Sequence, residues 1–127
     1  MSVDRDLLSA LVGLMNEDRE AFVPARLSIL VYLYFTHSAK FTNIQKKLNL
    51  TSGNLSSHVR KLEAIGLVSI SKGFVDLRPT TVVFITDKGM ERVREQLVKM
   101  RELVSAVVEQ GDVPVESETT AELRGSD

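Results

Sequence analysis

The sequence predicts a mainly α-helical fold that carries a small β-hairpin. Apolar residues recur at helical spacing in five segments, and a stretch rich in β-branched residues separates the fourth segment from the fifth. The length of 127 residues and the 43% share of hydrophobic residues suit one domain with a modest core and appendages. We therefore expect one α+β domain.

The first two predicted helices differ in how much of their surface is apolar. In the first, Leu7 and Leu11 belong to an apolar face that needs a partner. The second begins at Pro24, whose fixed φ suits the first helical turn, and runs to about residue 36. Because the second helix is apolar nearly all round, we expect it at the centre of the core.

Two shorter helices with a tight connection follow. The third spans residues 41–48, and the fourth begins at Thr51 or Ser52, either of which suits an N-cap, and ends before Gly66. One side of the fourth helix carries an apolar stripe, which we expect to be buried. The stripe consists of Leu55, Val59 and Leu62.

After Gly66 the pattern changes to that of a hairpin. Residues 67–71 alternate apolar and polar, residues 72–79 are turn-like, and residues 80–86 are rich in β-branched side chains. A long last helix opens at Asp87 or Thr86, with Asp87 as its expected cap, and runs to about residue 110. Its apolar residues alternate spacings of three and four, which is a heptad pattern typical of helix pairing.

Three short helices followed by a hairpin is the order of a winged helix-turn-helix. We expect one domain over residues 1–110, with a winged helix-turn-helix core over 22–87 and a C-terminal helix over 87–110. Residues 111–127 are acidic and almost without large apolar groups, so they cannot offset the entropy of ordering. We predict a disordered acidic tail there.

Composition excludes several classes of protein. The absence of cysteine excludes disulfides, thiolate zinc sites and cysteine nucleophiles. The longest apolar stretch, residues 29–35, is far shorter than the roughly 20 residues of a bilayer span. The N-terminus lacks the layout of a secretory signal. We therefore expect a cytoplasmic protein without a membrane anchor.

The charge of the chain is unevenly distributed. The formal net charge is −1, yet residues 37–89 hold eight lysine and arginine residues against three acidic ones. A basic segment of this kind is the electrostatic signature of a nucleic-acid binder. The sequence therefore indicates that the fourth helix and the hairpin bind DNA.

In a winged helix-turn-helix the fourth helix presents its outer face to the major groove of duplex DNA. Small polar residues permit close approach to base edges, an asparagine can pair bidentately with adenine, and Arg60 can clamp guanine or hold a phosphate. We expect this recognition helix to contact DNA through seven residues. They are Ser52, Gly53, Asn54, Ser56, Ser57, Arg60 and Lys61.

The wing supplies a second set of candidate DNA contacts. Lys72 and Arg78 flank a glycine-containing segment that we expect to form the tip, where they reach phosphates or the minor groove, and Thr80 adds a neutral hydrogen bond. Lys46 and Lys47 on the third helix either contact phosphates or form a solvated helix face.

The chain resembles the MarR- and ArsR-like winged-helix transcriptional regulators, and within them a compact archaeal and bacterial group of winged helix DNA-binding domains. The resemblance covers about residues 22–101. It is carried by "PARLSIL", "FTNIQKKLNLTSGNLSSHVRKLEAIGLV" and the wing "ISKGFVDLRPTTVVFITDKG". It implies a homodimeric repressor or activator, with residues 52–61 as the recognition segment and 72–80 as the wing. The cysteines of metal-sensing members are missing, so we expect neither a metal site nor a cofactor.

Two helices display more apolar surface than one small core can cover. We expect the first and the last helix to bury it against a second copy, which would set two recognition helices roughly 34 Å apart for a pseudo-palindromic operator. The expected dimer contacts are Leu7, Leu11, Val93, Leu97, Met100, Val104 and Val107.

Other readings of the same residues remain open. The basic face also suits an architectural protein that coats DNA with little sequence preference, and winged helices also serve as protein-interaction adaptors. We expect no enzymatic activity, because phosphate-cradling glycine loops and nucleophile motifs are absent from the sequence. The sequence leaves a small-molecule effector possible, but no motif indicates one. His58 is expected to be partly buried with a structural or phosphate-side role.

Overall fold

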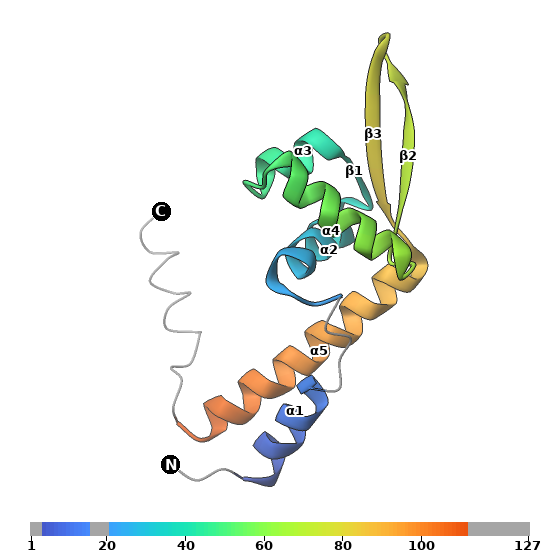
Figure 1. Cartoon of the computed structure of the whole chain (residues 1–127). Helices are drawn as coiled ribbons and strands as arrows, with labels where there is room; N and C mark the ends of the chain where they lie inside the picture. The colour runs from blue at the N-terminus through green and yellow to red at the C-terminus, as the bar shows by residue number, and fades with distance from the viewer. Residues whose placement is uncertain (1–3, 16–20, 112–127) are drawn as a thin grey trace. The chain divides into compact units, whose positions relative to one another are not determined.

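The computed structural model describes residues 4–15 and 21–111. All but the first residue of the predicted tail, 111–127, lies outside the described residues. The described residues divide into two compact units, one that falls within residues 17–96 and another that falls within residues 1–16 and 97–127. The elements are α1 (Arg5–Met15), α2 (Pro24–Thr36), β1 (Ser38–Lys40), α3 (Phe41–Lys47), α4 (Ser52–Ala64), β2 (Val68–Val75), β3 (Arg78–Ile85) and α5 (Asp87–Glu109). The predicted mainly helical fold with a β-hairpin is confirmed (Figure 1).

Side-chain hydroxyls cap two of the helices. The Asn54 N–H donates to Oγ1 of Thr51 over 3.1 Å, so Thr51 is the N-cap of α4, one of the two residues expected there. The Gly89 N–H donates to Oγ1 of Thr86 over 3.0 Å at the start of α5. The expectation that Asp87 caps α5 is therefore wrong, because Asp87 is already the first helical residue. Its carboxylate still lies in the first turn, where the helix dipole favours a negative charge.

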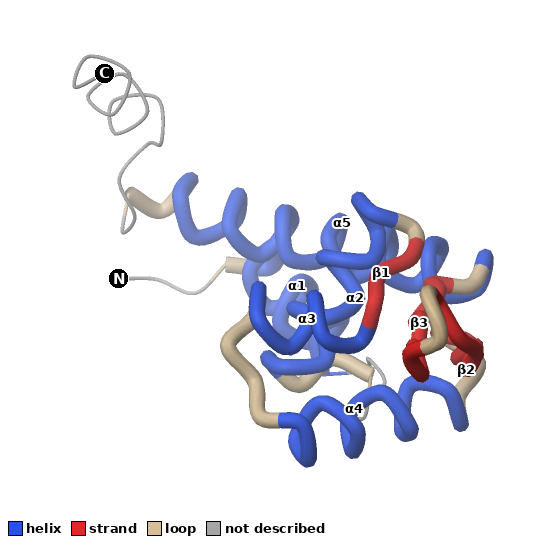
Figure 2. The backbone as a smooth tube through the Cα atoms, turned by 90° about the horizontal axis from the view of Figure 1, so that it is seen from above, coloured by secondary structure: helices blue, strands red, loops and turns tan. Residues whose placement is uncertain are grey.

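The three strands form one antiparallel sheet in the order β1-β3-β2 (Figure 2). The hairpin pairs Val68 with Ile85 at its base and Val75 with Arg78 at its far end. The short strand β1 adds to β3 by pairing Ser38 with Phe84, and it was not predicted. Three residues are too few to show an alternating pattern, so only the pairing with β3 identifies this strand.

The tip of the hairpin differs from the sequence expectation. The segment expected to be turn-like continues both strands, and Gly73 lies inside β2 opposite Thr80. The connection is only Asp76 and Leu77, with φ of 51° and 65°. Two central residues at positive φ are typical of a type I′ turn, which matches the twist of antiparallel strands. Lys72 therefore lies well below the tip, opposite Thr81.

The core of the unit formed by residues 17–96 gathers side chains from every one of its helices and from the sheet. As expected, α2 supplies the central residues, and the apolar stripe of α4 is buried against them. The cluster consists of Ala21, Ile29, Leu30, Leu33, Ile44, Leu55, Val59, Leu62, Leu67, Val68, Val83 and Val93. Burial of this stripe determines which side of α4 faces outward.

Val93 corrects one of the expected dimer contacts. Its side chain is fully buried in the core of its own chain, so it cannot face a second copy. The heptad pattern of the last helix therefore has two partners: its first turns pack into the chain's own core, and only its later apolar residues are open. A heptad read from sequence does not distinguish the two kinds of packing, because both need the same spacing.

Candidate nucleic-acid interface

Helix α4, the predicted recognition helix, has one buried side and one open side. Leu55, Val59 and Leu62 are buried, and Ser56 is partly buried. The other predicted contact residues are exposed in the described part of the chain: Ser52, Gly53, Asn54, Ser57, Arg60 and Lys61. The structure therefore brings the short polar side chains and the cations together on one accessible face. The first turn of α4 holds no acidic residue, which leaves its N-terminal dipole free to attract a phosphate.

A small groove joins the recognition helix to the wing. It has a volume of about 180 Å³, and its walls include Ser56 and Arg60 from α4 and Lys72 and Thr81 from the hairpin. Phe41, Val59 and Ile70 form the rest of its lining. Arg60 and Lys72, which come from separate elements, thus line one groove. Two positive charges on one concave surface suit the binding of a phosphate group.

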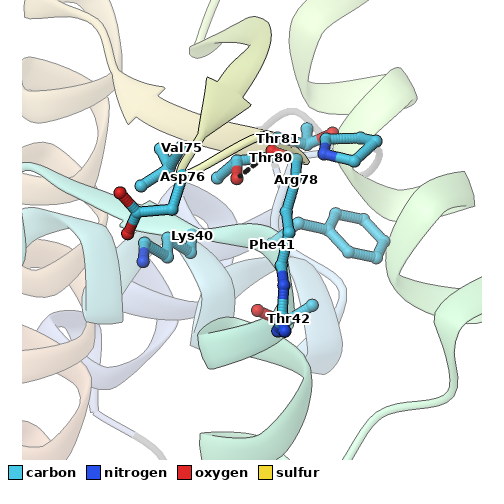
Figure 3. Close-up of a pocket in the computed structure, with 9 residues that line it drawn as sticks. Lys40, Phe41, Thr42, Val75, Asp76, Arg78, Thr80 and Thr81 are labelled. Atoms are coloured by element: carbon cyan, nitrogen blue, oxygen red, sulfur yellow. Dashed lines mark hydrogen bonds between the residues drawn. The ribbon is translucent and has the colours of Figure 1, made fainter.

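A larger groove lies between the start of α3 and the outer part of the wing. Its volume is about 700 Å³, and it brings the predicted residues Arg78 and Thr80 together with Lys40 and Thr42 (Figure 3). The Thr80 hydroxyl donates to the Arg78 carbonyl oxygen over 3.2 Å. Lys40 was not among the predicted contacts. Its place in the basic central segment was the only sequence signal, because the pairing of β1 with β3 is what brings it to the wing.

Lys46 and Lys47 are exposed in the last turn of α3, and neither lines either groove. The structure therefore does not bring them together with the cations of α4 and the wing. The exposure of both side chains fits either alternative for this pair, a phosphate contact or a solvated face.

His58 forms a hydrogen bond with a buried arginine that was not predicted from the sequence. Arg26 on α2 is 7% exposed, and its Nε–H donates to Nδ1 of His58 over 3.2 Å. This hydrogen bond requires His58 to carry its proton on Nε2. Burial, the Arg26 guanidinium and Lys61 together lower the pKa of His58 below its usual value. The expected partial burial of this histidine is therefore confirmed, and its hydrogen bond to Arg26 links α4 to α2.

The apolar residues of the second unit are partly open. Leu11, Leu97, Met100 and Val104 are exposed, while Leu7 and Val107 are half-buried. Leu8, Val12 and Val98 are also exposed and were not among the predicted dimer contacts. The exposure of Leu8 and Val12, four residues apart, widens the apolar strip of α1.

Within residues 4–15 and 21–111 no group of three histidine, aspartate or glutamate side chains could hold a metal ion. The helices described there include none that is both long enough and apolar enough to cross a bilayer.

Comparison with known proteins finds a family model and relatives of both sequence and structure. Residues 25–104 match the family described as "Winged helix DNA-binding domain". An uncharacterized protein of Methanocaldococcus jannaschii is 36% identical over 78 residues, which cover 61% of this chain and 85% of that protein. The uncharacterized HTH-type transcriptional regulator YdgJ of Bacillus subtilis is 30% identical over 104 residues, which cover 79% of this chain and 63% of YdgJ.

A solved structure is similar over most of both chains. The transcriptional regulator homologue from Pyrococcus horikoshii OT3 superposes with a TM-score of 0.71 at 41% identity, covering 83% of this chain and 99% of that one. The similarity therefore extends to the whole of the Pyrococcus chain.

Proposed function

Because the chain belongs to the winged helix DNA-binding domain family, we propose that it regulates transcription as a homodimer that binds specific duplex sequences. The resemblance to winged-helix transcriptional regulators is confirmed. The family is one of DNA-binding regulators and not of enzymes. The proposal adds three features: the homodimer, α4 in the major groove, and the wing on the backbone and minor groove.

One observation carries the proposal: the face of α4 opposite its buried leucines is open, polar and cationic. To read bases in the major groove, a helix must pack one face on the protein core and leave the opposite face open to the DNA. The exposed side chain of Asn54 near the start of α4 suits bidentate pairing with adenine, and Arg60 suits guanine or a phosphate.

The wing supports the same binding mode. Lys72 shares a groove with Arg60, and Arg78 shares another with Lys40. A duplex seated on α4 would place phosphates near both grooves, because the hairpin extends beyond α3 and α4 in Figure 1. We assign the wing cations to the phosphate backbone, where they set affinity and position the helix.

The exposed apolar residues of α1 and α5 support the homodimer. Several exposed apolar residues on the terminal helices of a regulator are typical of a subunit interface. A two-fold dimer presents two recognition helices to half-sites about one helical turn apart, roughly 34 Å.

In vitro selection of duplexes from a random pool tests the proposal. We expect an enriched pseudo-palindromic sequence that footprinting shows to be protected in two half-sites. The affinity for this duplex should exceed that for random duplex at the same salt by about a thousandfold or more. A ratio near one would replace sequence-specific regulation with architectural coating of DNA. Failure to bind any duplex at low ionic strength would overturn DNA binding by this chain.

A further inference from the structure

The far end of the wing carries apolar side chains that are open to solvent. Leu77 is 96% exposed and Phe74 is 75% exposed, and Val75 beside them is also exposed. Single exposed apolar residues are ordinary on protein surfaces. Three of them at the end of one narrow hairpin form an apolar tip that no other described part of the chain covers.

The backbone conformation at this tip is also energetically unfavourable. Leu77 has a φ of 65°, a conformation that glycine and asparagine adopt readily and leucine does not. Type I′ turns favour asparagine or aspartate followed by glycine, so Asp76 suits its position and Leu77 does not. A disfavoured backbone conformation and a disfavoured exposure at the same residue point to a role for the leucine side chain outside the folded chain.

The charges near the tip indicate the partner. Lys72 lies two residues before Phe74 and on the same face of β2, and Arg78 follows Leu77 directly. An apolar point with cations on its flanks is complementary to the minor groove of DNA, where stacked bases lie between two phosphate backbones. The carboxylate of Asp76 opposes this attraction. It lines the same groove as Lys40 and Arg78, whose charges offset it (Figure 3).

We propose that Leu77, supported by Phe74, is an apolar wedge that enters the minor groove beside the recognition site, partly separates one base step and bends the duplex. The inference rests on the proposed DNA binding, and adds that the protein deforms its site. A tip of only two turn residues is narrow enough for the minor groove, and apolar wedges at such positions kink DNA by unstacking bases. A preference for a pyrimidine–purine step at the wedge follows without any hydrogen bond to a base edge, because these steps unstack most easily.

The test uses the full chain and the duplex enriched by selection. End-to-end fluorescence energy transfer reports the bend, and 2-aminopurine placed under the wing reports unstacking. The variant is Leu77→Asn, because asparagine tolerates positive φ and keeps the turn while it removes the apolar side chain. Phe35→Gln is the matched control, since Phe35 is 76% exposed on α2 outside the wing.

We expect the wild type and Phe35→Gln to bend the duplex and to raise the 2-aminopurine signal. Leu77→Asn should leave the duplex nearly straight, lose the signal and bind about tenfold more weakly, because a leucine side chain is no longer buried. Its melting temperature should be equal or higher. Equal bending by Leu77→Asn, or an unbent duplex in the wild-type complex, would overturn the wedge while DNA binding stands. Absence of any wild-type complex would instead overturn the proposed function.

Discussion

At the scale of single residues, the salt dependence of DNA affinity distinguishes the cations that contact phosphates from those that do not. Arg60 lines the groove between α4 and the wing, and a phosphate contact there releases counterions. Arg60→Gln should weaken binding to any duplex and reduce the log–log slope of affinity against salt by slightly less than about one unit. Titrations at several salt concentrations measure this slope.

Arg101→Gln is the matched control, because Arg101 is exposed on α5 outside the interface. This variant should bind DNA with the wild-type slope. If Arg60→Gln changes affinity only for the selected sequence and keeps the slope, Arg60 contacts a base and not a phosphate.

The lowered pKa of His58 makes the stability of the chain depend on pH. Burial, Arg26 and Lys61 lower the pKa of His58 in the folded chain, so the unfolded chain binds a proton first as the pH falls. The contribution of His58 to stability is therefore complete above its unfolded pKa of about 6.5 and is lost as the pH falls through the lower folded value. Urea unfolding between pH 7.5 and pH 5 should show this loss.

His58→Asn provides the comparison, since its side-chain oxygen can still accept a hydrogen bond but does not titrate. The difference in unfolding free energy between wild type and His58→Asn should shrink as the pH falls. A difference that stays constant from pH 7.5 to pH 5 would contradict the lowered pKa.

At the scale of elements, the C-terminal end of α4 is joined closely to the start of α5. Lys88 Nζ donates to the Ile65 carbonyl oxygen over 2.9 Å, and Thr86 Oγ1 donates to that of Gly66 over 2.6 Å. Both bonds satisfy carbonyl groups that the end of α4 leaves unpaired, and the ammonium group also suits the negative end of the helix dipole. This joint fixes the recognition helix against the helix that continues to the proposed dimer contact.

Gly89 is the tightest point of this joint. A Cβ atom there would overlap the Leu67 carbonyl oxygen and lie 2.8 Å from Cγ1 of Ile85. Gly89→Ala should therefore lower the free energy of unfolding by about 1–3 kcal/mol, as overpacking does. Gly73→Ala is the control, because its Cβ would meet nothing within 4 Å and should leave stability unchanged or slightly higher. Equal stability of the two variants would show that Leu67 and Ile85 can move away from a Cβ atom at position 89 at no cost, and would contradict this prediction.

At the scale of the whole molecule, assembly into a dimer is expected to control DNA affinity. Val104 lies in the later part of α5 and is 50% exposed, so a charge there would be buried at the proposed interface. Val104→Glu should convert the dimer to a monomer in sedimentation experiments and abolish tight binding to a two-half-site duplex. Circular dichroism should show unchanged helix content.

Asn43→Glu adds the same charge at an exposed position on α3 and should leave the dimer intact. A Val104→Glu protein that remains dimeric would exclude this part of α5 from the interface.

The sequence alone determined the helices, the hairpin, the outward face of α4 and most of the candidate DNA contacts. These features follow from local spacing, since a buried stripe at every third or fourth residue also defines the opposite face. Thr51, Pro24 and Gly66 marked helix ends correctly because caps act on neighbouring residues.

Only the tertiary structure decided how segments distant in sequence meet. Pairing with β3 makes residues 38–40 a strand and brings Lys40 to the wing, and burial assigns Val93 to the core of its own chain. The Arg26–His58 hydrogen bond joins residues 32 positions apart. No local pattern specifies such contacts, because their free energy depends on which surfaces the folded chain brings together and removes from water.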